Sequence, residues 1–229
     1  MHAQSSLIMP PSYRSDPRDK IIIVSKFLED RYGKVKFKTE DPFDVLIRTI
    51  ISQRNKDEMT DKTFKRMSSE LRSIDDYLSV DSRRLANLIK PSGFYNQKAK
   101  MIKKAVKIIK DRYGGELPRT REELMALPGV GGKTADIVLS YGFGENVIAC
   151  DTHVIWISNA IGLVDSKDPE KVRERLMEIT PERYKRMLNI EMVEFGKEIC
   201  RTSRPKCSVC GLKYICNYYN KVYKKRYER

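Results

Sequence analysis

The feature that most constrains the fold is a start signal for α-helices that recurs along the chain. An acceptor side chain stands directly before proline at four places, Asp16–Pro17, Asp41–Pro42, Asp168–Pro169 and Thr180–Pro181. The acceptor satisfies free N–H groups of the first helical turn, and proline suits the first helical position because no donor is needed there. Each signal therefore predicts a helix that begins at the proline.

The spacing of apolar residues also indicates helices. Residues 102–113 carry apolar side chains at intervals of three and four, and Thr120 with Glu123 forms the pattern of a capping box. Residues 45–52 are apolar on nearly every side, which suits a helix buried inside a bundle. Alternation typical of strands is confined to 34–38 (KVKFK), which is too short to argue for a sheet. We therefore predict an all-α fold.

The chain is strongly basic, with 45 Lys and Arg against 31 Asp and Glu and a formal net charge of +14. This surplus favours a polyanionic partner, because binding a phosphate backbone releases condensed counterions. Nucleic acid is the leading candidate, and a basic surface without such a partner is the alternative. No apolar run approaches the ~18 residues of a membrane span, and the N-terminus lacks the apolar centre of a signal peptide. We expect a cytoplasmic protein with no membrane partner and a flexible extension over 1–18.

Four of the five cysteines fall within seventeen residues, a spacing typical of metal ligands rather than of a disulfide framework. A structural zinc site usually has two close pairs of cysteines, whereas only one CxxC pair is present here. Zn²⁺ and an iron–sulfur cluster therefore both remain possible from the residues alone. We expect the fifth cysteine, Cys150, to be a small buried residue. The four candidate ligands are Cys200, Cys207, Cys210 and Cys216.

The loop between the first two of these cysteines is basic. If the cysteines hold a metal group, the loop is held rigid and its cations are suited to contact phosphates. Its basic residues are Arg201, Arg204 and Lys206. The tail over 217–229 also mixes aromatic and basic residues, and either a phosphate contact or a solvated C-terminus explains it.

A glycine-rich segment, LPGVGGKTA, precedes an apolar helix. Gly129, Gly131 and Gly132 allow positive φ and close backbone approach, so amides at the helix start could bind a phosphate oxygen. A tight turn between two helices is the alternative explanation. Lys133 falls in the first helical turn, where the helix dipole lowers the pKa of an amine, so it suits a nucleophile or a phosphate contact. Asp151, at the start of a later helix, could be an N-cap alone.

The combination of these motifs resembles the endonuclease III family, in the helix-hairpin-helix DNA glycosylase superfamily. LPGVGGKTA is followed eighteen residues after its lysine by DTHV (151–154), and then by four cysteines separated by six, two and five residues. The resemblance covers roughly residues 20–220, and it includes SQ (52–53) and GFYNQKA (93–99).

The resemblance implies two helical domains with the active site in the cleft between them. One is a six-helix barrel over 34–145 that contains a helix-hairpin-helix motif at about 118–143. The other is built from both ends of the chain, over 19–33 and 146–229. It would hold a [4Fe–4S] cluster on the four cysteines, with a scaffolding role and possible redox sensitivity.

The resemblance also assigns roles to single residues. Lys133 is the nucleophile and Asp151 the essential carboxylate, which stabilises positive charge on the sugar as the glycosidic bond breaks. The neutral amine expels the base and leaves an imine, and loss of a neighbouring proton then cleaves the 3′ side by β-elimination. Gln53 and Phe94 would fill the gap left by the flipped nucleotide. Their alternatives are a helix cap or a local hydrogen bond for Gln53 and a core position for Phe94.

These inferences predict a bifunctional DNA glycosylase and abasic-site lyase of base excision repair. We expect a monomer that acts on double-stranded DNA containing an oxidised pyrimidine or an abasic site. A monofunctional mismatch glycosylase is the first alternative, but attack by water would not need Lys133. A non-catalytic DNA-binding module is the second, and the presence of both Lys133 and Asp151 disfavours it. No short motif encodes which base is preferred.

Overall fold

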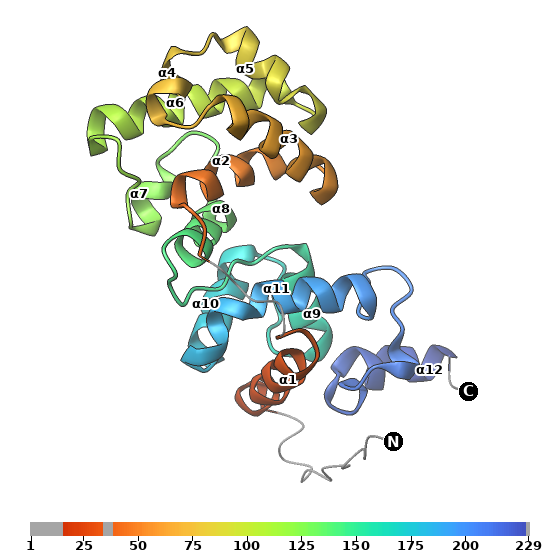
Figure 1. Cartoon of the computed structure of the whole chain (residues 1–229). Coiled ribbons are helices and arrows are strands. Elements are labelled where there is room, and N and C mark those ends of the chain that lie inside the picture. The colour runs from red at the N-terminus through yellow and green to blue at the C-terminus, as the bar shows by residue number, and fades with distance from the viewer. Residues whose placement is uncertain (1–15, 34–38, 228–229) are drawn as a thin grey trace. The chain divides into compact units, whose positions relative to one another are not determined.

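The computed structural model describes residues 16–33 and 39–227 (Figure 1). The alternating stretch 34–38 lies outside the described residues, as do residues 1–15 of the expected extension and the last two residues of the tail. All regular elements within the described ranges are helical, which confirms the all-α prediction. The chain divides into two compact units, one of Lys38–Glu145 and one that combines Met1–Phe37 with Asn146–Arg229.

The unit of Lys38–Glu145 is organised around α2, which contacts α3, α6 and α8. Its apolar side chains, from Val45 to Ile51, are buried, as expected for a helix inside a bundle. Asp41 caps this helix by accepting hydrogen bonds from two N–H groups of its first turn. The helices are α2 (Pro42–Ser52), α3 (Asp57–Glu70), α4 (Ile74–Ser79), α5 (Ser82–Leu88), α6 (Tyr95–Tyr113), α7 (Arg121–Met125) and α8 (Gly132–Ile137), with short turns η2 (Lys90–Ser92) and η3 (Val138–Gly142).

Helices α7 and α8 form a hairpin. Thr120 caps α7 by accepting from the N–H of Glu123 at 3.3 Å. The predicted capping box is only half formed, because the Glu123 carboxylate accepts from the Thr120 hydroxyl instead of the backbone N–H. The Arg121 guanidinium contacts the buried Asp136 carboxylate at 3.1 Å and so joins the two helices.

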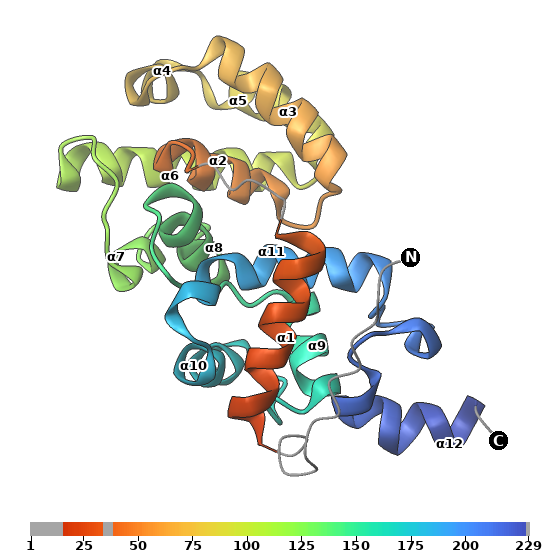
Figure 2. The same cartoon turned by 60° about the horizontal axis from the view of Figure 1, so that its bottom comes forward.

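The unit formed from both ends of the chain packs α1 across α11 (Figure 2). Its apolar core includes Ile21 and Val24 from α1, Val154 from α9 and Phe195 from α11. The helices are α1 (Pro17–Tyr32), α9 (Thr152–Ile161), α10 (Pro169–Ile179), α11 (Glu182–Glu198) and α12 (Lys224–Tyr227), with short turns η4 (Cys207–Val209), η5 (Lys213–Ile215) and η6 (Tyr219–Tyr223).

The helix-start signals are confirmed at three of the four places. Asp16, Asp41 and Asp168 each cap a helix whose first residue is the following proline. The prediction for Thr180–Pro181 is wrong by one residue, because α11 begins at Glu182. Thr180 is the C-cap of α10, and its buried hydroxyl has no hydrogen-bond partner within the described chain, so it does not cap the next helix. Among residues 16–33 and 39–227, no helix has the length and apolar character to cross a membrane.

Candidate active-site residues and candidate metal centre

The turn between α7 and α8 uses its three glycines differently. Gly129 has a φ of +85°, and a Cβ added there would lie 3.2 Å from Met101 Cβ and Sδ, so this position requires glycine. Gly131 is extended, and Gly132 is the first residue of α8. The expectation that these glycines serve positive φ therefore holds only at Gly129. At Gly131 a Cβ would meet no atom within 4 Å, which leaves the backbone open to close approach.

Lys133 is the second residue of α8, as the glycine motif predicted. Its side chain is exposed. Within the described part of the chain it makes no hydrogen bond and no ion pair. Among the described residues, the amine therefore has no partner that holds it.

Asp151 is the N-cap of α9, so the simpler interpretation of this residue is correct as far as it goes. Its Oδ1 accepts from the N–H of Val154 at 2.9 Å. Its Oδ2 accepts nothing from the described residues, so one oxygen holds the carboxylate in place while the other is available. Asn189 of α11 donates to the carbonyl of Ala149 at 2.7 Å, and this bond holds the backbone segment that leads into Asp151. Cys150, which stands between Ala149 and Asp151 in the sequence, is buried, as predicted.

His153 belongs to the first turn of the same helix, and its position depends on a glycine in α11. A Cβ at Gly196 would overlap the His153 Nδ1 atom. That nitrogen is buried and has no hydrogen-bond partner among the residues described. The sequence analysis missed this contact, although a glycine inside an otherwise helical pattern is a signal from which a close approach can be predicted. Gly196 thus makes room for the turn that carries Asp151.

Gln53 and Phe94 turn out to have different neighbours. The Gln53 amide donates to the carbonyl of Gly129 at 2.8 Å, a contact with a distant segment rather than the local hydrogen bond of its alternative role, and Gln53 is also the C-cap of α2. Phe94 is 59% exposed, so it is not a core aromatic. The Arg54 guanidinium lies 5.5 Å from the centre of the Phe94 ring. Arg54 is a residue that the sequence-based reasoning missed, because a single arginine in a polar loop matches no motif.

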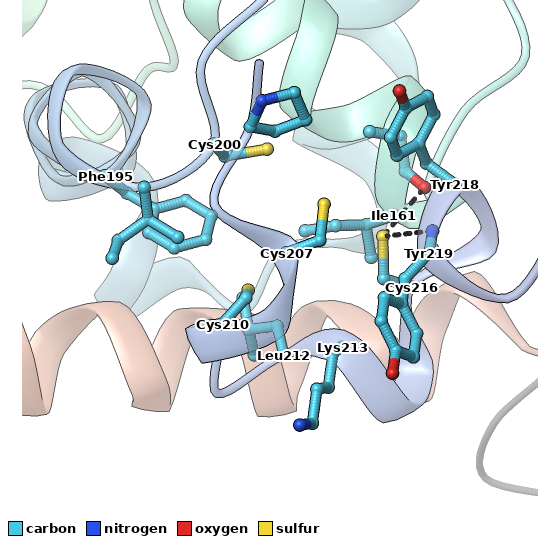
Figure 3. A pocket seen from close by; sticks show the side chains of 13 residues that line it. Ile161, Phe195, Cys200, Cys207, Cys210, Leu212, Lys213, Cys216, Tyr218 and Tyr219 are labelled. Carbon is cyan, nitrogen blue, oxygen red and sulfur yellow. Dashed lines mark hydrogen bonds between the residues drawn. The ribbon is translucent and has the colours of Figure 1, made fainter. Parts of the chain in front are cut away.

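The four clustered cysteines line one pocket, with their sulfur atoms around its interior (Figure 3). All are free thiols. Burial raises the pKa of Cys200 to about 12, and it also raises the pKa values of Cys210 and Cys216. No three His, Cys, Asp or Glu side chains in the described ranges are close enough to hold one metal ion.

The basic loop between Cys200 and Cys207 is exposed. Its closure comes from the N–H of Lys206, which donates to the carbonyl of Ile199 at 3.0 Å. Arg201 Nε donates to the carbonyl of Lys197 at 3.1 Å, and Arg204 adopts a φ of +53°. The loop is thus pinned at its ends while all three cations remain at the surface.

Comparisons with known proteins agree on one family. The family model for HhH-GPD superfamily base excision DNA repair proteins matches residues 47–182. The chain is 44% identical to endonuclease III of Thermotoga maritima over 184 residues, which is 80% of this chain and 86% of that relative. It also resembles a solved structure of a trapped endonuclease III–DNA covalent intermediate, with a TM-score of 0.83 and 33% identity over 89% of this chain and 97% of the other.

A second solved structure also resembles this chain. It is a thermostable thymine-DNA glycosylase, with a TM-score of 0.81 over 88% of this chain and 97% of the other. Because the identity is 24%, that likeness concerns the fold alone.

The chain belongs to the endonuclease III family of helix-hairpin-helix base excision repair proteins. Its activity is that of a bifunctional DNA glycosylase and lyase.

Proposed function

We propose that this chain excises oxidised pyrimidines from double-stranded DNA, with Lys133 as the nucleophile and Asp151 as the carboxylate. The observation that carries the proposal is the position and exposure of the Lys133 amine. Its amine stands in the first turn of the helix after the glycine turn, exposed and without a partner in the described chain. A lysine that only stabilised the helix would lie at the opposite end, where the dipole attracts a cation.

The reaction follows from these two side chains. The neutral Lys133 Nζ attacks the anomeric carbon of the damaged nucleotide, and the base leaves with the electrons of the glycosidic bond. The Asp151 carboxylate stabilises the positive charge that develops on the sugar, and it can accept the proton lost by the amine. The nitrogen lone pair then expels O4′, which opens the sugar ring and leaves an imine at C1′. This imine makes the adjacent C2′ proton acidic. Removal of that proton expels the 3′ phosphate and cleaves the strand.

Other residues would position the DNA. The open backbone at Gly131 allows a phosphate to approach the N–H groups at the start of α8. The surface cations Arg201, Arg204 and Lys206 would contact further phosphates without reading bases. The exposed Phe94, with Arg54 above its ring, would enter the base stack when the target nucleotide is flipped. Gln53 would act indirectly, by holding the Gly129 turn.

The four pocket cysteines are proposed to hold a [4Fe–4S] cluster. Thiolates are the ligands that such clusters require, and all four sulfurs line a single pocket. When bound, the cluster would cross-link the segment that carries the basic loop and could gain or lose an electron. We expect purified protein to be brown and to contain iron and sulfide. A colourless preparation with stoichiometric zinc would contradict this assignment.

Borohydride trapping on duplexes with one defined lesion tests the proposed chemistry. Lys133→Gln removes the amine, so no adduct should be trapped and no strand should be cleaved, while damaged DNA still binds. Lys107→Gln, which changes an exposed lysine of the same unit, should behave like the wild type. An adduct trapped by Lys133→Gln would move the nucleophile to another amine. Release of thymine opposite guanine without strand cleavage would instead favour a mismatch glycosylase.

A further inference from the structure

Lys20, near the start of α1, is a buried cation whose hydrogen-bond partners among the described residues are all neutral. Its side chain is 1% exposed. Its Nζ donates to the carbonyl of Ile161 at 2.9 Å and to Asn217 Oδ1 at 2.8 Å, and both acceptors are neutral. No carboxylate in the described chain forms a salt bridge with it. An unpaired buried charge is costly, so the position calls for a compensating negative charge nearby.

The two acceptors place the Lys20 amine beside a candidate cluster ligand. Asn217 directly follows Cys216, and Ile161 directly follows Ala160, whose carbonyl oxygen lies 3.3 Å from Cys216 Sγ. A Cβ at Gly162 would overlap the Asn217 amide, so this glycine allows the segments to meet. Burial lowers the pKa of Lys20, and among its neighbours Cys216 opposes that change by charge attraction.

Lys213, unlike Lys20, lines the cysteine pocket itself. The Lys213 amine points away from the sulfur atoms (Figure 3), and it donates to the carbonyl of Ser208 at 3.1 Å. Lys221 is exposed, and its charge acts on Lys20. Water screens an exposed charge far more than a buried one. Of these three lysines, Lys20 is therefore the one whose charge is least screened.

We propose that Lys20 is the buried counter-charge of the iron–sulfur cluster and that its ammonium raises the reduction potential of that cluster. The inference rests on the cofactor assignment made under Proposed function. Four thiolates outweigh the charge of the metal core, so the bound group is an anion. Each added electron makes it more negative, and a nearby cation stabilises the reduced state more than the oxidised state. The cation therefore raises the reduction potential whichever oxidation states the cluster moves between.

The test uses the cluster-loaded full chain and measures the reduction potential by protein-film voltammetry, with iron and sulfide content determined alongside. Lys20→Met removes the charge and should lower the reduction equilibrium constant about tenfold, which is ~59 mV for one electron. Lys20→Arg keeps the charge and should stay close to the wild type. Lys221→Met is the matched control, because it removes an exposed charge near Lys20, and it should change the potential much less.

The outcomes separate this inference from the cofactor assignment. Wild-type protein without iron would overturn the cofactor and this inference with it. Loaded wild-type and Lys20→Met proteins with equal potentials would overturn only the role of Lys20. If Lys20→Met does not load, Lys20→Gln keeps a donor without the charge and takes its place. Failure of both neutral variants to load, with Lys20→Arg loading normally, would support the counter-charge, whereas failure of all three would show that the site needs the lysine's shape.

Discussion

The Arg54 guanidinium lies over the Phe94 ring, 5.5 Å from its centre, and both residues adopt positive φ angles, 53° and 48°. Positive φ is strained for side chains of this size, so two costly conformations meet at one exposed contact. Such strain is often retained at sites that bind ligands. The pair lies in the unit of Lys38–Glu145, where the Gln53 amide also holds the glycine turn.

Phe94→Ala should therefore slow base release without unfolding the protein. Filling the gap beside a flipped nucleotide offsets part of an unstacking cost of a few kcal/mol, so we expect about a tenfold loss in single-turnover rate. Arg54→Ala should have a smaller effect, because an exposed cation–π contact contributes only ~0.5–1 kcal/mol. Tyr214→Ala, which removes another exposed aromatic residue, is the control. Equal rates for Phe94→Ala and this control would rule out the wedge.

Asp151→Asn separates capping from catalysis. Asparagine caps helices as well as aspartate, so the thermal midpoint should stay near that of the wild type. Loss of the carboxylate should lower base release about 100-fold or more, the scale of one electrostatic or acid–base contribution. Asp168→Asn is the matched control, because Asp168 caps α10 through a hydrogen bond of the same length, 2.9 Å. If both variants keep full activity, Asp151 is a cap and nothing more.

The glycines of the hairpin should respond in opposite ways to alanine. Gly131→Ala fits the extended backbone and meets no atom, so stability should not change. Its methyl group would obstruct a phosphate, so DNA affinity should fall and the salt slope should drop by ~1. Gly129→Ala forces a side chain into positive φ against Met101 and should cost ~1–3 kcal/mol of unfolding free energy. Calorimetry and salt-dependent binding measure the two effects, and an unchanged slope in Gly131→Ala would place the phosphate elsewhere.

Glu191 should make stability depend on pH. It is 2% exposed, its Oε2 has no partner in the described ranges, and burial, aided by Glu29, raises its pKa from 4.5 to about 7. The folded state therefore holds a proton that the unfolded chain releases at lower pH. This contribution, roughly 3 kcal/mol, is complete below pH 4.5 and is lost as the pH rises to about 7.

Glu191→Gln carries no titrating carboxyl, so the protein should gain stability at pH 8 and lose this part of its pH dependence. Denaturant unfolding at several pH values measures it. Glu194→Gln, on the same helix but half exposed beside Lys197, is the control and should change the profile little. A wild-type profile that is flat between pH 4.5 and 7 would contradict the raised pKa.

Much of this fold could be predicted from sequence patterns whose physical effect is confined to one helical turn. Asp16, Asp41 and Asp168 cap the helices that their side chains predicted, because an N-cap bond spans only two or three residues. The apolar residues of 45–51 are buried as their pattern required. The close spacing of the four cysteines likewise anticipated one shared pocket.

Contacts between distant segments were decided only in the tertiary structure. The Gln53 amide donates to the carbonyl of Gly129, 76 residues away. The Phe94 ring lies against the guanidinium of Arg54, which belongs to another loop. The Lys20 amine bonds to groups 141 and 197 residues along the chain. From the sequence alone, Lys20 would be placed on the exposed, charged face of its helix. Whether a charge is buried depends on which segments pack over it, and local periodicity carries no information about that packing.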